Sequence, residues 1–155
     1  MRPPDPRVRP ANPTDADRIR ELQSHLRQPS PELLEYGLVA GTTLVSVADG
    51  SVADGSGEAT GSAGGEPVGY LLPVDARDRA GCHLAELVVA PAFRREGRAR
   101  GLVSAALRGA TGPVTLQAHP DNDAAIALYE SLGFEVVDRR SDAYADGDAL
   151  VYRYD

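Results

Sequence analysis

The sequence predicts a single α/β domain, residues 1–155, with one mixed sheet of about seven strands and about four helices. Three observations favour this fold class. The length suits one domain with one hydrophobic core. Short apolar runs rich in valine and leucine read as strands. Segments with apolar residues at helical spacing stand between them, in the order strand, helix, helix, three strands, helix, strand, helix, two strands.

The N-terminal part predicts a short strand at residues 8–9 followed by two helices. The segment NPTDADRIRELQSHL carries isoleucine and leucine at helical spacing. We expect Thr14 to cap this first helix, because Asp17 stands three residues further on, as in a capping box. Pro31 suits the first position of a second helix over residues 32–38.

The middle of the chain predicts two strands, at 42–48 and 67–74, separated by a low-complexity insert at about 49–66. The insert contains the repeat SVADG, at 46–50 and again at 51–55. Its glycine, serine, alanine and acidic residues offer too little apolar surface to order it. We expect an expanded solvated loop; an acidic lid over a substrate is the alternative.

The second half alternates strands with helices. Residues 82–89 form a strongly apolar strand of the kind found in a sheet centre. Residues 98–108 have apolar side chains at i, i+3, i+4, i+7 and i+8, which predicts a helix. Residues 113–118 form another buried strand.

The C-terminal part predicts one more helix and a closing hairpin. Either Asn122 or Asp121 caps the helix, and Gly133 ends it in a left-handed conformation. The last two strands are expected at 134–138 and 148–152, joined by a turn.

Composition limits the partners and the environment. The chain has 16 basic residues, all arginine, against 23 acidic ones, giving a net charge of −7. This field repels nucleic acid and anionic membranes. With a single cysteine and no long apolar run, the sequence predicts a cytoplasmic protein without a disulfide. The acidic, lysine-free composition favours a halophilic origin; a GC-rich genome is the alternative.

One motif lies where the strand at 82–89 leads into the following helix. Arg94, Gly97 and Ala99 have the spacing R-x-x-G-x-A at the expected helix start. Unpaired N–H groups and the helix dipole make such an end an anion site, and small residues let a diphosphate approach the backbone. The pattern alone also fits an ordinary loop, and it is neither a Walker loop nor a G-x-G-x-x-G fingerprint.

A second motif, N-x-x-A-x-x-L-Y-x-x-x-G-F, runs from Asn122 to Phe134. Together with V-x-P-x-x-R-x-x-G-x-A, in this order and separation, it resembles the GNAT superfamily of acetyl-CoA-dependent N-acetyltransferases. The resemblance covers nearly the whole chain apart from the insert. It implies a sheet splayed between the strands that end at Val89 and Ala118, where the pantetheine arm would bind.

The resemblance also implies roles for individual residues. Tyr129 matches the tyrosine beside the CoA sulfur, where it would protonate the leaving thiolate; without the motif it reads as a core residue of a helix. The residues implied to bind acetyl-CoA are Val88, Val89, Arg94, Arg95, Glu96, Gly97, Arg98, Ala99, Arg100, Asn122 and Ala125.

The ending DAYADGDALVYR is similar to that of the N-terminal protein acetyltransferases, including the ribosomal-protein alanine type. Those enzymes imply a glutamate base at the position of Gln117, which cannot accept a proton. Glu86, acting through water, and His119 are the replacement candidates. For Glu86, a solvated or hydrogen-bonded strand carboxylate is the alternative. Tyr144 and His119 are the expected substrate-binding residues, although His119 also fits a plain loop.

These observations predict acetyl transfer from acetyl-CoA to a primary amine, with a protein N-terminal α-amine as the expected substrate. The alternatives are a small-molecule amine, such as a polyamine, an amino acid or an antibiotic, and an acyl-CoA sensor without turnover. The three histidines are too scattered to predict a metal site. We expect a monomer or homodimer.

Overall fold

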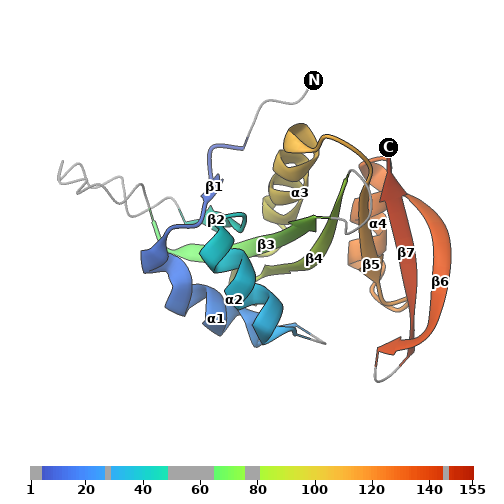
Figure 1. Cartoon of the computed structure of the whole chain (residues 1–155), viewed down its shortest axis with the longest axis horizontal. Coiled ribbons are helices and arrows are strands. Elements are labelled where there is room, and N and C mark those ends of the chain that lie inside the picture. The colour runs from blue at the N-terminus through green and yellow to red at the C-terminus, as the bar shows by residue number, and fades with distance from the viewer. Residues whose placement is uncertain (1–4, 27–28, 49–64, 76–80, 145–146) are drawn as a thin grey trace. The chain divides into compact units, whose positions relative to one another are not determined.

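The structure is a computed structural model that describes residues 5–26, 29–48, 65–75, 81–144 and 147–155 (Figure 1). Most of the predicted insert, residues 49–64, lies outside these ranges. The helices and strands are β1 (Val8–Pro10), α1 (Ala16–Gln23), α2 (Pro31–Ala40), β2 (Leu44–Val47), β3 (Pro67–Asp75), β4 (Cys82–Val89), α3 (Arg98–Gly109), β5 (Val114–Ala118), α4 (Asp123–Ser131), β6 (Glu135–Tyr144) and β7 (Gly147–Tyr154).

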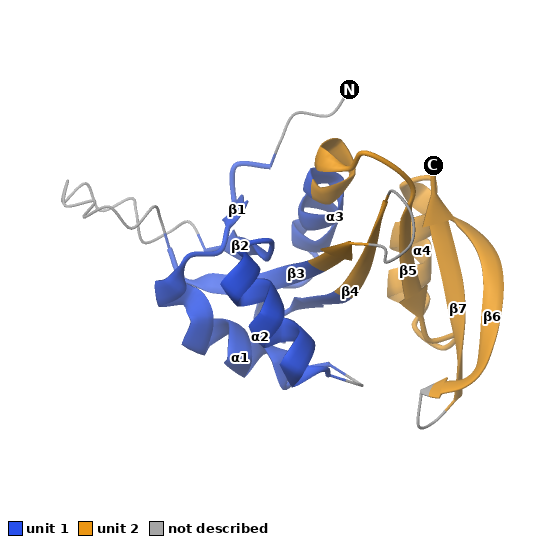
Figure 2. Ribbon diagram, viewed as in Figure 1, with its two compact units in different colours: residues 1–72, 86–105 blue, residues 73–85, 106–155 orange. Residues whose placement is uncertain are grey.

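The strands form one seven-stranded mixed sheet in the order β1-β2-β3-β4-β5-β7-β6. β4 and β5 pair in parallel, whereas β1–β2, β2–β3, β5–β7 and β6–β7 pair antiparallel. The predicted fold class and the predicted order of elements are therefore confirmed. The chain divides into two compact units (Figure 2), and each is described by itself below.

The first unit comprises Met1–Leu72 and Glu86–Ala105. Helices α1 and α2 lie side by side in it (Figure 1). Each of its helices buries apolar side chains on one face, as the 3.6-residue periodicity predicts, whereas Tyr36 and Val39 of α2 are exposed. The side chains with no exposed surface include Ile19, Leu22, Leu34, Leu102 and Val103.

The N-terminal cap differs from the prediction. Asn12, not Thr14, is the capping residue, and it caps a 3-10 turn at Pro13–Asp15 that leads into α1. The Thr14 N–H donates to Asn12 Oδ1 at 3.1 Å, and the Asn12 N–H donates to the Asp15 carboxylate at 2.9 Å. The helical segment starts closer to the N-terminus than predicted because the fixed φ of Pro13 suits the first position of the 3-10 turn.

The second unit comprises Pro73–Ala85 and Ala106–Asp155. In it, Cys82–Leu84 pair in parallel with Val114–Leu116. The residues of β4 beyond Ala85 belong to the first unit, so the splay of the two strands stays a prediction.

The closing hairpin is longer than predicted. β6 continues to Tyr144 and β7 begins at Gly147, so the predicted strand limits at 138 and 148 are too narrow. The register shifts between Arg140 and Tyr144. The Arg139 Nε donates to the Asp148 carboxylate at 2.9 Å across the two strands. Residues 139–142, which extend β6, are exposed and polar or charged, so hydrophobic patterning does not reveal the extension.

Candidate active site

The predicted phosphate turn lies between β4 and α3 in the first unit. After Val89 the chain makes a 3-10 turn at Pro91–Phe93, and α3 begins at Arg98. Gly97 has φ +78°. A Cβ built on Gly97 would have only the Arg7 guanidinium within 4 Å among the described residues, at 3.8 Å. The glycine therefore leaves open space beside the start of the helix, where backbone N–H groups and the helix dipole suit a diphosphate.

Two arginines of the turn differ in their surroundings. Arg94 is exposed, and its Nε donates to the Val89 carbonyl at 2.8 Å, which fastens the turn to the end of β4. Arg95 is exposed and adopts φ +66°, a left-handed conformation that is uncommon for residues other than glycine.

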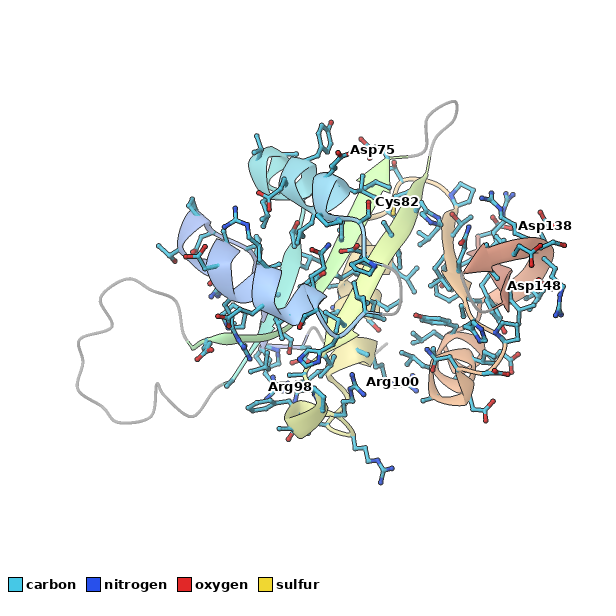
Figure 3. The ribbon with its side chains drawn as sticks, turned by 90° about the horizontal axis from the view of Figure 1, so that it is seen from below. Asp75, Cys82, Arg98, Arg100, Asp138 and Asp148 are labelled. Atoms are coloured by element: carbon cyan, nitrogen blue, oxygen red, sulfur yellow. The ribbon has the colours of Figure 1, made fainter. Side chains whose placement is uncertain are left out.

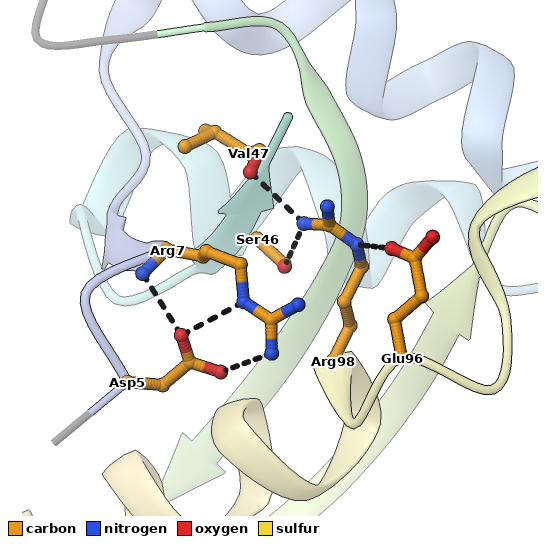
Figure 4. Close-up of polar contacts among 6 residues, drawn as sticks. All are labelled: Asp5, Arg7, Ser46, Val47, Glu96 and Arg98. Atoms are coloured by element: carbon orange, nitrogen blue, oxygen red, sulfur yellow. Dashed lines mark hydrogen bonds and ion pairs between the residues drawn. The ribbon is translucent and has the colours of Figure 1, made fainter. Parts of the chain in front are cut away.

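Arg98 points into the protein rather than outward (Figure 4). Its side chain is 6% exposed. Nη1 donates to Ser46 Oγ at 3.0 Å and to the Val47 carbonyl at 2.9 Å, and Nε donates to Glu96 at 2.8 Å. The guanidinium also lies 5.5 Å from the Phe93 ring centre. Because the Arg98 guanidinium bonds to β2, it is not available to bind the cofactor. Of the groups of Arg98, only the backbone N–H is still expected to contact acetyl-CoA.

Asp5 and Arg7, from the N-terminal segment, lie against the start of α3, and the sequence analysis did not predict them there. The Arg7 guanidinium donates to the Asp5 carboxylate at 3.0 and 2.8 Å, and the Arg7 backbone N–H adds a bond of 2.9 Å. These contacts hold the pKa of Asp5 below its usual value. Asp5 packs so closely on Gly101 that a Cβ there would overlap the carboxylate. The side chains of Arg98 and Arg100 leave the same helix start (Figure 3).

Glu86 is a buried carboxylate on β4, 5% exposed. The Gln23 Nε2 donates to both of its oxygens, at 3.0 and 3.1 Å. The Ser30 backbone N–H donates to Oε2 at 2.7 Å, and the Tyr70 hydroxyl donates to Oε1 at 2.9 Å. Burial, followed by the charge of Glu86, raises the pKa of Tyr70 well above its ordinary value.

Tyr129 lies in the second unit, on α4, and is 6% exposed. Its ring centre is 5.9 Å from that of Phe134 and 6.0 Å from that of Tyr152. Gly133, at φ +102°, ends the helix, and the Phe134 N–H donates to the Tyr129 carbonyl at 3.1 Å. The predicted helix stop is confirmed, and it fixes the tyrosine in an aromatic cluster.

Asn122 and Ala125 contact each other. The Ala125 N–H donates to Asn122 Oδ1 at 3.2 Å, which caps α4. The predicted cap is confirmed. This bond occupies the Asn122 oxygen and the Ala125 N–H. The Asn122 amide NH₂ is therefore the group expected to contact a cofactor arm.

His119 follows β5 and is 6% exposed. Its Nδ1 accepts from the Asp121 N–H at 3.0 Å, which places the ring proton on Nε2 in the neutral form. A Cβ on Gly147 would lie 2.9 Å from this Nε2, so the ring packs directly on the start of β7. Asp138 and Asp148 lie on the same hairpin (Figure 3), and Tyr144 is its last described residue on β6.

The candidate residues thus fall into two groups. The phosphate turn and Glu86 lie in the first unit, while Asn122, Tyr129 and His119 lie in the second. Within the described ranges, no group of three or more His, Cys, Asp or Glu residues is arranged to hold a metal ion. None of the described helices is both long enough and apolar enough to cross a membrane.

A strand-to-helix turn of this form, followed by a capped helix with a central tyrosine, defines an acetyltransferase fold. The model of the acetyltransferase (GNAT) family matches residues 18–134, and the chain belongs to this family.

Solved structures of similar fold include N-terminal acetyltransferases. The NatC complex bound to Gag peptide and CoA contains a chain with TM-score 0.75 and 22% identity, covering 94% of this chain and 95% of that one. The ribosomal-protein-S18-alanine N-acetyltransferase from Escherichia coli has TM-score 0.71 and 21% identity, with 94% and 90% covered. Arabidopsis thaliana NAA60 in complex with acetyl-CoA has TM-score 0.72 and 23% identity, with 95% and 97% covered.

A curated relative is the mycothiol acetyltransferase of Clavibacter sepedonicus. It is 50% identical over 52 residues, which is 33% of this chain. The match spans only 17% of that relative's length.

Proposed function

We propose that this chain transfers the acetyl group of acetyl-CoA to a primary amine. The observation that carries the proposal is the open backbone at Gly97, beside the start of α3, in a chain that belongs to the GNAT family. When bound, acetyl-CoA would supply an activated thioester. The turn from Arg94 to Arg100 would hold its diphosphate through backbone N–H groups and exposed guanidinium groups.

The protein's own groups would serve the transfer in three ways. Backbone N–H groups near Val88 and Val89 would polarise the carbonyl oxygen. The Tyr129 hydroxyl would hold a proton for the departing sulfur, and its packing against two aromatic rings would keep Oη in place. The Asn122 amide would orient the cofactor arm.

A protein N-terminal α-amine is the substrate we propose. Its support is the fold similarity to N-terminal acetyltransferases, together with the ending DAYADGDALVYR on the β6–β7 hairpin. Tyr144 and His119 would contact the peptide. The second candidate is a small-molecule amine, which the 52-residue similarity to mycothiol acetyltransferase favours. The net charge of −7 suits a cationic amine in either case.

The experiment that tests the activity measures CoA thiol release from acetyl-CoA. The acceptors are peptides with varied N-terminal residues, polyamines, amino acids and amino sugars. Turnover that depends on the first residue of the peptide would support the N-terminal amine. Tight CoA binding without turnover of any amine would contradict the proposal and favour a sensor.

The role of Tyr129 has its own test. Tyr129→Phe keeps the ring in its aromatic cluster and removes the proton. We expect kcat to fall about 10²-fold or more, while the Kd for acetyl-CoA stays unchanged. Tyr152→Phe is a matched control, because it removes a hydroxyl from the same cluster. An unchanged kcat in Tyr129→Phe would exclude the role as acid.

A further inference from the structure

The Glu86 carboxylate joins segments that lie far apart in the sequence. Gln23 is the last residue of α1, and Ser30 is the residue before α2. Both donate to the same carboxylate, so the two ends of the α1–α2 connection are fixed at one point of β4. Tyr70 adds a bond from β3. All four residues belong to the first unit.

The oxygens of this carboxylate are well occupied. Oε1 accepts from Gln23 and Tyr70, and Oε2 accepts from Gln23 and Ser30, at distances of 2.7 to 3.1 Å. A carboxylate has about four lone-pair sites. The four hydrogen bonds occupy the lone-pair sites of the Glu86 carboxylate. The carboxylate therefore does not accept a proton from the substrate or from a bridging water.

We propose that Glu86 is a positioning residue that anchors both ends of the α1–α2 connection to the donor strand and thereby sets amine binding. The inference rests on the proposed function, in which the end of β4, three residues beyond Glu86, carries the acyl donor. We take the amine to approach the end of β4 past the segments fixed to this strand. The carboxylate therefore acts through Gln23 and Ser30 rather than as a base.

Hydrogen exchange tests the anchor without any substrate. Glu86→Gln has the same shape, but its NH₂ group would face donors. We expect the Ser30 amide to exchange at least about 10-fold faster in this variant, since a bond to a charged acceptor is lost. Glu21→Gln is the matched control, because Glu21 is an exposed glutamate on α1. An unchanged Ser30 exchange rate in Glu86→Gln would overturn the proposal.

Kinetics with a peptide that bears a free N-terminal alanine separate the two roles. A positioning role predicts that Glu86→Gln raises KM for the peptide at least about 10-fold and keeps the acid limb of the kcat–pH profile. A base predicts a fall in kcat of about 10²- to 10⁴-fold, loss of that limb and an unchanged KM. The second result would overturn the proposal.

Two further variants keep the test decisive where Glu86→Gln folds poorly. Gln23→Met removes donors but leaves the carboxylate, so an anchor predicts a raised KM and a base predicts a normal one. The exchange Gln23→Glu with Glu86→Gln restores one bond between α1 and β4, so an anchor predicts partial recovery of KM. A normal KM in Gln23→Met, or no recovery in the exchange, contradicts the anchor. If the wild-type protein acetylates none of the amines, the proposed function fails, and the Ser30 exchange measurement still decides the role of Glu86.

Discussion

Replacing Arg98 by methionine tests whether this residue supports the phosphate turn from inside. The guanidinium donates to two buried acceptors, Ser46 Oγ and the Val47 carbonyl. Each acceptor left without its donor costs about 1–3 kcal/mol. The ion pair with the half-exposed Glu96 adds only about 0–1 kcal/mol. Methionine keeps part of the packing on Phe93, and relief from burying a cation offsets some of the loss. We expect a net loss of about 2–4 kcal/mol.

The measurement is urea unfolding at constant pH, with the acetyl-CoA Kd measured on the folded protein. Arg95→Met is the matched control, because it makes the same exchange in the same turn at an exposed position. It should change the free energy of unfolding by less than about 0.5 kcal/mol and weaken acetyl-CoA binding. Unaltered stability of Arg98→Met combined with weaker acetyl-CoA binding would refute the reasoning, because the guanidinium would then serve the ligand and not the fold.

Four other predictions follow from the same structure. Gly97→Glu should abolish acetyl-CoA binding in a folded protein, because a side chain at φ +78° adds strain and a negative charge beside the phosphates; calorimetry with an unchanged Kd would contradict this. Gly81→Ala should destabilise the protein by at least about 2 kcal/mol, since Gly81 has φ +119° and the added Cβ would overlap the Pro113 carbonyl. Gly109→Ala, where a Cβ has open space, should be neutral or stabilising, and equal melting temperatures of the two variants would exclude the overlap at Gly81. Molar KCl should raise the melting temperature by about 5 °C or more if the net charge of −7 reflects a high-salt environment, and no rise would argue against it. Replacing residues 50–64 by a short glycine-containing turn should leave stability and turnover nearly unchanged, and a selective loss of turnover would show a substrate lid.

The sequence predicted the elements whose signal is local. The limits of β4 agree with the apolar run at 82–89, and α3 begins at the predicted residue 98. Both elements bury apolar side chains at the period of their own backbone, so a short window of sequence contains the information. The C-terminal hairpin was predicted too short because residues 139–142 are exposed polar or charged residues that give no apolar alternation.

Contacts over long sequence separations were beyond the reach of such patterns. Gln23 and Glu86 are 63 residues apart, and Arg98 and Ser46 are 52 apart. No periodicity or spacing relates such pairs, because their distance in space is set only when the strands take their places in the sheet. The motif therefore predicted a role for Arg98, but not that its side chain contacts Ser46 and Val47.

Burial provides the distinction that the motif lacks. Arg98 was predicted to bind acetyl-CoA and Glu86 to act as the base, and each is about 5–6% exposed, with hydrogen bonds to its own chain. Burying a charged or polar group is costly unless the protein satisfies it, and each of these groups has internal hydrogen-bond partners. The side chain of an exposed residue such as Arg95 is solvated and needs no internal partner, so its charge can interact with a ligand. Arginines of the phosphate turn should therefore separate in experiment: replacing buried Arg98 should alter stability, and replacing exposed Arg95 should alter acetyl-CoA affinity alone.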